Sequence, residues 1–299
     1  MKNIILLFIA VTFVTLGANA QDILTIEEMN STYKKEKHQT KRAQPYSHLR
    51  QADVMWSRKI WREIDLRQKI NHPFYYPEND GFIVVTDDRK SLIDVLYSAI
   101  LEGSVIAYDN AVMDDEFREQ MSQENIYKIG GAEKRTVTKT DWDAVAEGAD
   151  PEEAKITEVI DIPFDRNSIK KWRIKEEWFF DKQRSVLDVR ILGLCPLQEG
   201  KDEVTGQKNG TFNPLFWVYF PEARKVLINA EVFNLVKNDA ERRTYDDIFW
   251  KRMFGSTITK EANVYDRKVD EYMVGLDALL EAEKIKAEIF NLEHDLWEY

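Results

Sequence analysis

Four apolar side chains stand at even positions between residues 169 and 181 of this 299-residue chain: Trp172, Ile174, Trp178 and Phe180. Charged side chains stand between them, namely Lys171, Arg173, Lys175 and Glu177. A period of two puts one set on each face of a strand, and a strand with one polar face is typical of an antiparallel sheet. We predict a meander of strands at 156–161, 169–181, 184–195, 214–220 and 225–233, with a tight hairpin at 181–184 and a long polar loop at 200–213.

Helical periodicity flanks the predicted sheet on both sides. Residues 49–69 carry apolar side chains that share one broad sector of a helical wheel: Leu49, Val54, Trp56, Ile60, Trp61 and Ile64. A second predicted helix begins at the capping residues 86–88, after a strand at 82–86, and ends at Gly103. Further predicted elements are a strand at 105–108 and helices at 113–124, 241–254 and 261–294, the last standing off the core in its final third. The predicted fold class is α+β, an antiparallel β meander with flanking helices, a helical N-terminal part and a long C-terminal helix.

The first twenty residues have the layout of a secretory signal peptide. Lys2 precedes an uncharged apolar run at 4–16, and residues 18–20 (Ala-Asn-Ala) form a small-residue cleavage site. We therefore predict that residues 1–20 are removed and that the chain is exported. Composition divides the rest into four parts: an arm or linker at 21–48, a mixed helical and strand part at 49–127, a mobile loop at 128–155, and the sheet with the C-terminal helices at 156–299. We predict that residues 49–299 form one compact domain.

Charge is distributed unevenly along the chain. In total 42 Lys and Arg stand against 53 Asp and Glu, and the net charge of −11 argues against nucleic acid as a partner. Residues 31–69 nevertheless hold eleven of the basic residues and only four of the acidic ones. A solvated basic helix face is one interpretation of this excess. The other is a face that docks a protein partner, formed by Arg58, Arg62, Lys69, Met55 and Trp61.

No group of residues in the sequence has the spacing of a reactive site. One acidic group lacks the alternating ligands and central glycine of a calcium loop and is better explained as a helix cap: Asp109, Asp114, Asp115 and Glu116. Asp141 and Asp143 would need a fixed separation across a cleft to act as a carboxylate pair. Cys195 ends an apolar strand and is expected to be buried. We therefore predict no enzyme activity, no catalytic or metal site, no cofactor and no small-molecule substrate.

The eight tryptophans separate into two predicted groups. Four have inward phases on predicted strands or helices and are expected in the core: Trp172, Trp178, Trp217 and Trp250. Trp61 and Trp297 are expected at a surface or interface, where tryptophan is enriched. The tryptophan content and the export signal leave two further functions open, a secreted carbohydrate-binding or carbohydrate-active protein and a periplasmic chaperone.

Four long segments of the chain resemble a known family. They are residues 52–77 (ADVMWSRKIWREIDLRQKINHPFYYP), 181–196 (DKQRSVLDVRILGLCP), 216–234 (FWVYFPEARKVLINAEVFN) and 245–267 (YDDIFWKRMFGSTITKEANVYDR). In content and order they resemble the gliding-motility protein family GldN, also called PorN. That family belongs to the type IX secretion system of the Bacteroidetes.

The resemblance implies a role that the residues alone do not indicate. It implies a non-enzymatic periplasmic protein, peripheral to the outer membrane, that joins a GldK (PorK) type lipoprotein and further copies of itself in a ring. It also implies contact with the periplasmic part of the GldM (PorM) type inner-membrane motor protein. The machine that results would secrete proteins, motility adhesins among them.

Overall fold

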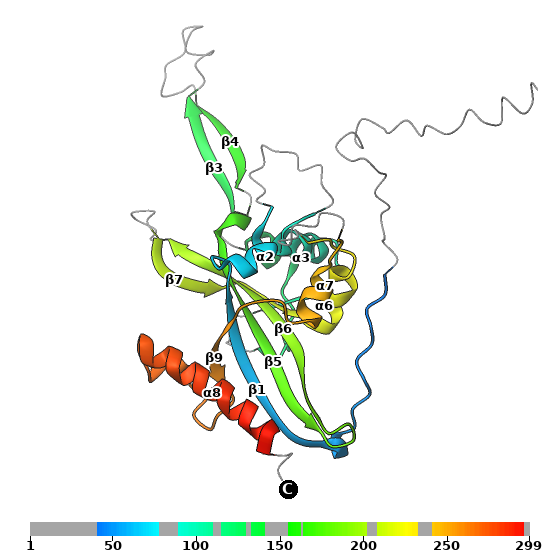
Figure 1. Ribbon diagram of the computed structural model, residues 1–299. Helices are drawn as coiled ribbons and strands as arrows, with labels where there is room; N and C mark the ends of the chain where they lie inside the picture. The colour runs from blue at the N-terminus through cyan, green and yellow to red at the C-terminus, as the bar shows by residue number, and fades with distance from the viewer. Residues whose placement is uncertain are drawn as a thin grey trace, which may run out of the picture. The chain divides into compact units, whose positions relative to one another are not determined.

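Three long antiparallel strands form the centre of the sheet: β1 (Val54–Asp65), β5 (Ile169–Asp181) and β6 (Val186–Lys201). Four shorter strands complete it, namely β2 (Ala107–Tyr108), β7 (Lys208–Pro214), β8 (Trp217–Tyr219) and β9 (Thr257–Glu261). The strand order is β2-β8-β6-β5-β1-β9, and β7 pairs with β6 (Figure 1). This computed structural model describes residues 41–77, 89–109, 115–129, 133–140, 155–162, 164–201, 208–232 and 241–295. Residues 41–299 form one compact unit.

The α+β class with an antiparallel sheet and a long C-terminal helix is confirmed, whereas the predicted meander is wrong in its strand order. β1 occupies the free edge of β5, from Val54 opposite Asp181 to Asp65 opposite Lys171. β4 (Lys155–Ile162) pairs instead with β3 (Glu133–Thr140) in a separate two-stranded sheet. β3 lies inside the stretch predicted as a loop. The predicted loop at 200–213 is also shorter, because β6 extends to Lys201 and β7 begins at Lys208.

The helix predicted at 49–69 is a strand. Exposed and partly buried residues alternate along the first half of β1, the pattern of a strand with two different faces. Trp56, Ile60 and Ile64 are four residues apart, which fits one face of a helix and equally one face of a strand. β-branched and aromatic side chains favour the strand, and pairing with the long β5 decides between the two.

Four helices cover one end of the β1–β5–β6 sheet (Figure 1): α2 (His72–Tyr75), α3 (Leu92–Leu101), α6 (Phe220–Leu227) and α7 (Tyr245–Trp250). They enclose the largest core cluster, whose bulkiest members include Trp172, Phe74, Phe216, Tyr245 and Phe249. The predicted strand at 225–233 is wrong, because α6 starts with a proline in its first turn and continues through Leu227. Helix α3 ends before Gly103 as predicted, and Gly103 itself has a φ of +73°. Its N-cap is Ser91 rather than a residue of 86–88.

Helix α8 (Leu276–Asp295) packs against the other end of the sheet and forms a second core cluster. Ile60 and Ile64 share one face of β1 by alternation, yet Ile60 belongs to this cluster and Ile64 to the larger one. The C-terminal helix thus begins fifteen residues later than predicted, since residues 257–261 form β9. The last third of the predicted helix 261–294 does not stand off the core, because Ile285 and Ile289 are buried there.

The opposite face of the sheet carries a smaller cluster: Trp61, Cys195, Leu197 and Trp217. Partly buried aromatic side chains pack around it, among them Phe117.

The helix predicted at 113–124 is absent from the described part of that range up to Ser122, and a short α4 (Gln123–Tyr127) follows. Four predicted features lie outside the described residues: the signal peptide, the strand at 82–86, the pair Asp141 and Asp143, and Trp297. Within those residues, no helix is long and apolar enough to cross a membrane.

We expect Gly193→Ala to destabilise the fold by about 1–3 kcal/mol, the usual cost of overpacking. A Cβ at this position would lie 2.5 Å from Cζ of Phe117, whose backbone is itself constrained at a φ of +58°. Urea denaturation of both proteins measures the difference. In the background of Phe117→Ala the glycine substitution should cost much less, and an equal cost in both backgrounds would contradict the close packing as its cause.

Candidate functional site

An extended segment, residues 41–50, lies against the body of the protein without joining the sheet. Ala43, Tyr46 and Leu49 are partly buried, and the residues between them are exposed. A burial pattern that repeats every three residues fits the three residues per turn of a polyproline II helix, whose backbone groups form no internal hydrogen bonds. The arrangement therefore resembles a bound peptide supplied by the chain itself.

Two arginines hold this segment by its main-chain carbonyls. Nη1 of Arg224 donates to the carbonyl oxygen of Gln44 at 2.9 Å, and Nη2 of Arg190 donates to that of Ser47 at 2.6 Å. Arg224, on α6, is fixed by Asp246 on α7 through two bonds, Nε to Oδ1 at 2.7 Å and Nη2 to Oδ2 at 3.1 Å. Because both side chains are buried, this ion pair joins the two helices and the segment in one rigid unit.

Tyr46 anchors the segment in a stack of aromatic and guanidinium groups. Its ring stacks on Trp250 with centroids 5.5 Å apart and planes at 23°. The guanidinium of Arg224 lies 4.6 Å from the Tyr46 ring centroid and 5.0 Å from that of Trp250, and Arg190 lies 5.1 Å from the former. Burial raises the pKa of the Tyr46 hydroxyl. Burial opposes the charge of Arg224, yet the hydrogen bonds that its guanidinium donates to Asp246 raise its pKa, so the cation persists at neutral pH.

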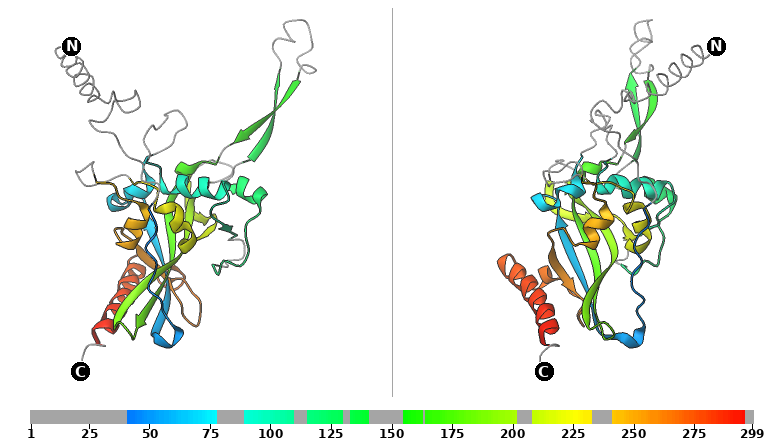
Figure 2. Two further views of the ribbon diagram at one scale, coloured as in Figure 1. Left: turned by 90° about the vertical axis from the view of Figure 1, so that its right-hand side faces the viewer. Right: turned by 45° about the vertical axis from the view of Figure 1, so that its right-hand side comes forward.

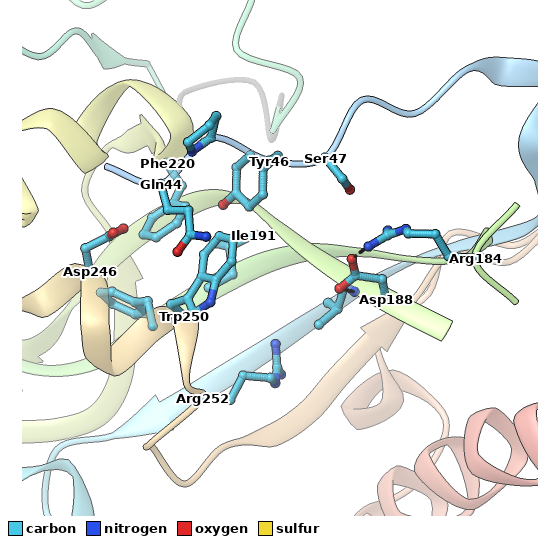
Figure 3. A pocket seen from close by; sticks show the side chains of 13 residues that line it. Gln44, Tyr46, Ser47, Arg184, Asp188, Ile191, Phe220, Asp246, Trp250 and Arg252 are labelled. Atoms are coloured by element: carbon cyan, nitrogen blue, oxygen red, sulfur yellow. Dashed lines mark hydrogen bonds and ion pairs between the residues drawn. The ribbon is translucent and has the colours of Figure 1, made fainter. Parts of the chain in front are cut away.

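A pocket of about 470 Å³ remains beside the segment. Figure 3 shows Arg184 and Asp188 at one end and Asp246 with Trp250 at the other. Its lining is Gln44, Pro45, Tyr46, Ser47, Arg184, Asp188, Val189, Ile191, Phe220, Asp246, Phe249, Trp250 and Arg252. This volume is within the usual range for a binding pocket, roughly 300–1,000 Å³.

The charged groups of the pocket are already paired. Arg184 bonds to Asp181 at 2.7 Å and to Asp188 at 3.2 Å, and Arg252 lies 2.9 Å from the carboxylate of Glu176. Arg190 does not line the pocket, and although its Nη2 donates to Ser47, its Nε is buried without a hydrogen-bond partner. The arrangement suits recognition of a chain segment by aromatic stacking and hydrogen bonds to carbonyl groups, rather than capture of a free ion.

The structure shows where Cys195 and Asp115, two of the residues considered for chemistry, lie. The thiol is fully buried, as predicted, and burial raises its pKa to about 12. Asp115 caps no helix, contrary to expectation, and instead pairs with Lys175 at 3.1 Å. Among the described residues, no three or more His, Cys, Asp or Glu side chains are grouped to hold a metal ion.

We expect Cys195 to resist thiol reagents in the folded chain at about pH 8. With a pKa of about 12, roughly one thiol in ten thousand is the reactive thiolate, and burial blocks access as well. Labelling followed by mass spectrometry should therefore require denaturation, after which the thiol reacts fully. Rapid labelling of folded protein would contradict the burial.

The predicted docking residue Trp61 is not at a surface. Only 7% of it is exposed, and its indole Nε1 donates to Asp115 Oδ2 at 2.5 Å. The ammonium of Lys260 lies 4.6 Å from the ring centroid. Because β1 is a strand, Trp61 points to the face opposite that of Arg58 and Arg62. The five predicted residues therefore do not form one face.

The other four predicted docking residues lie apart. Arg58 pairs with Glu261 at 3.0 Å and with Glu288 of α8 at 3.8 Å. Arg62 donates to the hydroxyl of Ser256 at 2.8 Å, and burial lowers its pKa. Met55 and Lys69 are exposed, but they lie at or beyond opposite ends of β1. Their role in partner binding stays a prediction.

The sequence patterns did not identify Tyr46 and Trp250 as a site. Trp250 was expected in the core, yet it is 47% exposed, because Tyr245, Ile248 and Phe249 already occupy the inward side of the short α7. Of the other three, Trp172 and Trp217 are buried and Trp178 is partly buried. Pro45 beside Tyr46 was the one local signal, since it favours extended backbone.

The structure is thus an α+β scaffold that holds an extended segment of its own chain with two arginines and stacked aromatic rings. A family model described as "Gliding motility associated protein GldN" matches residues 49–298. The chain therefore belongs to the GldN family and is a component of the gliding-motility and type IX secretion apparatus. The match includes Arg224, Asp246 and Trp250, and it begins at residue 49, so it covers only the last two residues of the segment that they hold. No curated protein matches the chain significantly.

Proposed function

We propose that this protein is a non-enzymatic structural component of the type IX secretion machinery, located in the periplasm against the outer membrane. Membership of the GldN family over residues 49–298 is the observation that carries the proposal. The N-terminal sequence supports export, since it has the charged start, apolar run and small-residue site of a signal peptide. In this role the chain joins a GldK-type lipoprotein and further copies of itself in a ring and contacts the GldM-type motor protein. The assembled machine secretes proteins that include motility adhesins.

Within this role, the Tyr46 pocket is the proposed contact with an extended segment of the lipoprotein. The supporting features are the half-exposed Trp250, the pocket beside it and two arginines that already hold peptide carbonyls. Because aromatic and arginine side chains dominate the energetics of protein interfaces, a small site of this kind can account for much of the binding energy.

Trp250→Ala is the variant that tests this contact. We expect the lipoprotein to co-purify from the envelope at least tenfold less with the variant, and secretion of a reporter cargo to fall with it, since a central tryptophan typically contributes 2 kcal/mol or more. Lys251→Glu, also exposed on the same turn, is the matched control and should behave as wild type. Undiminished co-purification of a correctly folded Trp250→Ala protein would place the contact elsewhere.

One experiment separates the structural role from the alternatives. A tagged chain recovered from the envelope in a large stoichiometric complex with a lipoprotein supports a ring component. A small monomer that binds or cleaves glycans would instead support a carbohydrate-directed protein. Transient association with many secreted proteins, without a stable complex, would support a chaperone.

A further inference from the structure

The pocket beside Tyr46 has an apolar and largely aromatic lining. Trp250 is 47% exposed, and its ring stacks on that of Tyr46. Further apolar side chains complete the lining: Pro45, Val189, Ile191, Phe220 and Phe249. Rings pack favourably on the face of a tryptophan, so this lining favours a ligand that presents a flat, apolar ring of its own.

The charges of the pocket lining cancel, and each of them is engaged. Two arginines stand against two aspartates: Arg184, Arg252, Asp188 and Asp246. All four form ion pairs with neighbouring side chains, at distances between 2.7 and 3.2 Å. A charged ligand would have to break one of these pairs, so the pocket is suited to an uncharged segment.

Hydrogen bonding in the pocket favours a ligand that accepts rather than donates. The indole Nε1 of Trp250 forms no hydrogen bond among the described residues, so it can donate to a carbonyl of the ligand. Both carboxylates of the lining, in contrast, already accept from arginines. An ordinary residue bound here would bring a backbone N–H that costs free energy if it finds no acceptor, whereas proline has no N–H.

The chain already places one segment of this kind at the site. Residues 41–50 have the three-residue burial repeat of a polyproline II helix, and Pro45 lines the pocket. Figure 2 shows this segment in an extended path beside the body, from the start of β1 toward the helical end. A second segment in the same conformation can bind next to it at a small cost in entropy, because polyproline II structure is formed before binding.

We propose that the Tyr46 pocket binds a proline-containing polyproline II segment, and that the lipoprotein supplies this segment. The inference rests on the proposed contact with the lipoprotein and names the chemistry of the segment that makes it. A proline ring packs on the exposed part of Trp250, and a carbonyl beside it accepts from the indole Nε1. At that position the segment carries neither a charge nor a backbone N–H.

A fluorescently labelled decaproline peptide tests this chemistry on protein purified after expression of the full chain. By fluorescence anisotropy we expect it to bind at least tenfold more tightly than a glycine–serine peptide of the same length and charge. Trp250→Ala should weaken decaproline binding at least tenfold. Trp250→Phe, which keeps a ring without the indole donor, should weaken it about threefold to tenfold, the usual effect of one hydrogen bond. Lys251→Glu is the matched control and should bind as wild type.

Competition with the lipoprotein gives a second readout. Saturating decaproline, present while the complex assembles, should lower co-purification of the lipoprotein to the level of Trp250→Ala, and the glycine–serine peptide should not. Equal affinity for the two peptides overturns the proposal, as does decaproline binding that survives Trp250→Ala or fails to compete. If Trp250→Ala still lowers co-purification in those cases, the lipoprotein contact stands and only the chemistry of its segment is wrong. Undiminished co-purification with Trp250→Ala contradicts the contact itself.

Discussion

Asp246→Ala should destabilise the folded chain by about 3–5 kcal/mol, because it leaves the cation of Arg224 buried without its carboxylate. Arg224 and Asp246 are 4% and 6% exposed, and the pair joins α6, α7 and the segment at 41–50. Loss of Asp246 therefore removes the fixed position of the guanidinium that Gln44 and Tyr46 depend on. We expect the segment to detach at temperatures well below global unfolding.

Two measurements check this expectation. Urea denaturation gives the change in unfolding free energy, and hydrogen exchange at residues 44–47 reports the segment directly. Arg224→Met combined with Asp246→Leu removes both charges and should recover most of the stability. The segment should stay loose, because the guanidinium that donates to the carbonyl of Gln44 is gone. If Asp246→Ala cost less than about 1 kcal/mol, the pair would be solvated rather than buried.

Arg252→Ala should have the second largest effect, about 3 kcal/mol. Glu176 is completely buried in β5, between the two core clusters on the sheet. Its Oε1 lies 2.9 Å from Nη2 of Arg252 without hydrogen-bond alignment, and its Oε2 accepts from Nη2 at 3.1 Å. The indole Nε1 of Trp178 is the other donor to Oε2, at 3.1 Å. Removal of Arg252 leaves a buried carboxylate with one neutral donor.

The matched variant is Glu176→Gln in the same background. A neutral amide keeps the shape of the side chain and removes the unpaired charge, so the double variant should be more stable than Arg252→Ala alone. A double-mutant cycle on urea unfolding gives the coupling energy between the two residues. Equal stability of the single and double variants would show that the arginine acts by packing on Trp178 and Phe254 rather than by charge.

The strands β5 and β6 could be predicted from sequence because their evidence is local. The strand predicted from alternation at 169–181 has the same two end residues as β5. The hairpin predicted after Asp181 connects β5 to β6. β1 could not be predicted the same way, since apolar residues spaced by four satisfy both periods. Its identity depends on β5 and β9, which are 100 or more residues away in the chain and offer it two strand edges.

The candidate sites differ in what local patterns could reveal. The charge excess at 31–69 drew attention to Arg58 and Arg62, but their partners, Glu261, Glu288 and Ser256, lie some 200 residues further on. Apart from Pro45, nothing in the local sequence around Tyr46 or Trp250 marks either residue as part of a site. They become a site only because α6 and α7 carry Arg224 and Asp246 to the same place.

Local periodicity and residue order establish the α+β class, the long strands of the hairpin and membership of the GldN family. Contacts between distant parts of the chain establish which strands are neighbours, which charges are paired and where the segment at 41–50 is held. The physical reason is that a side chain's burial and partner are set by residues far away in the chain, and no local pattern contains them.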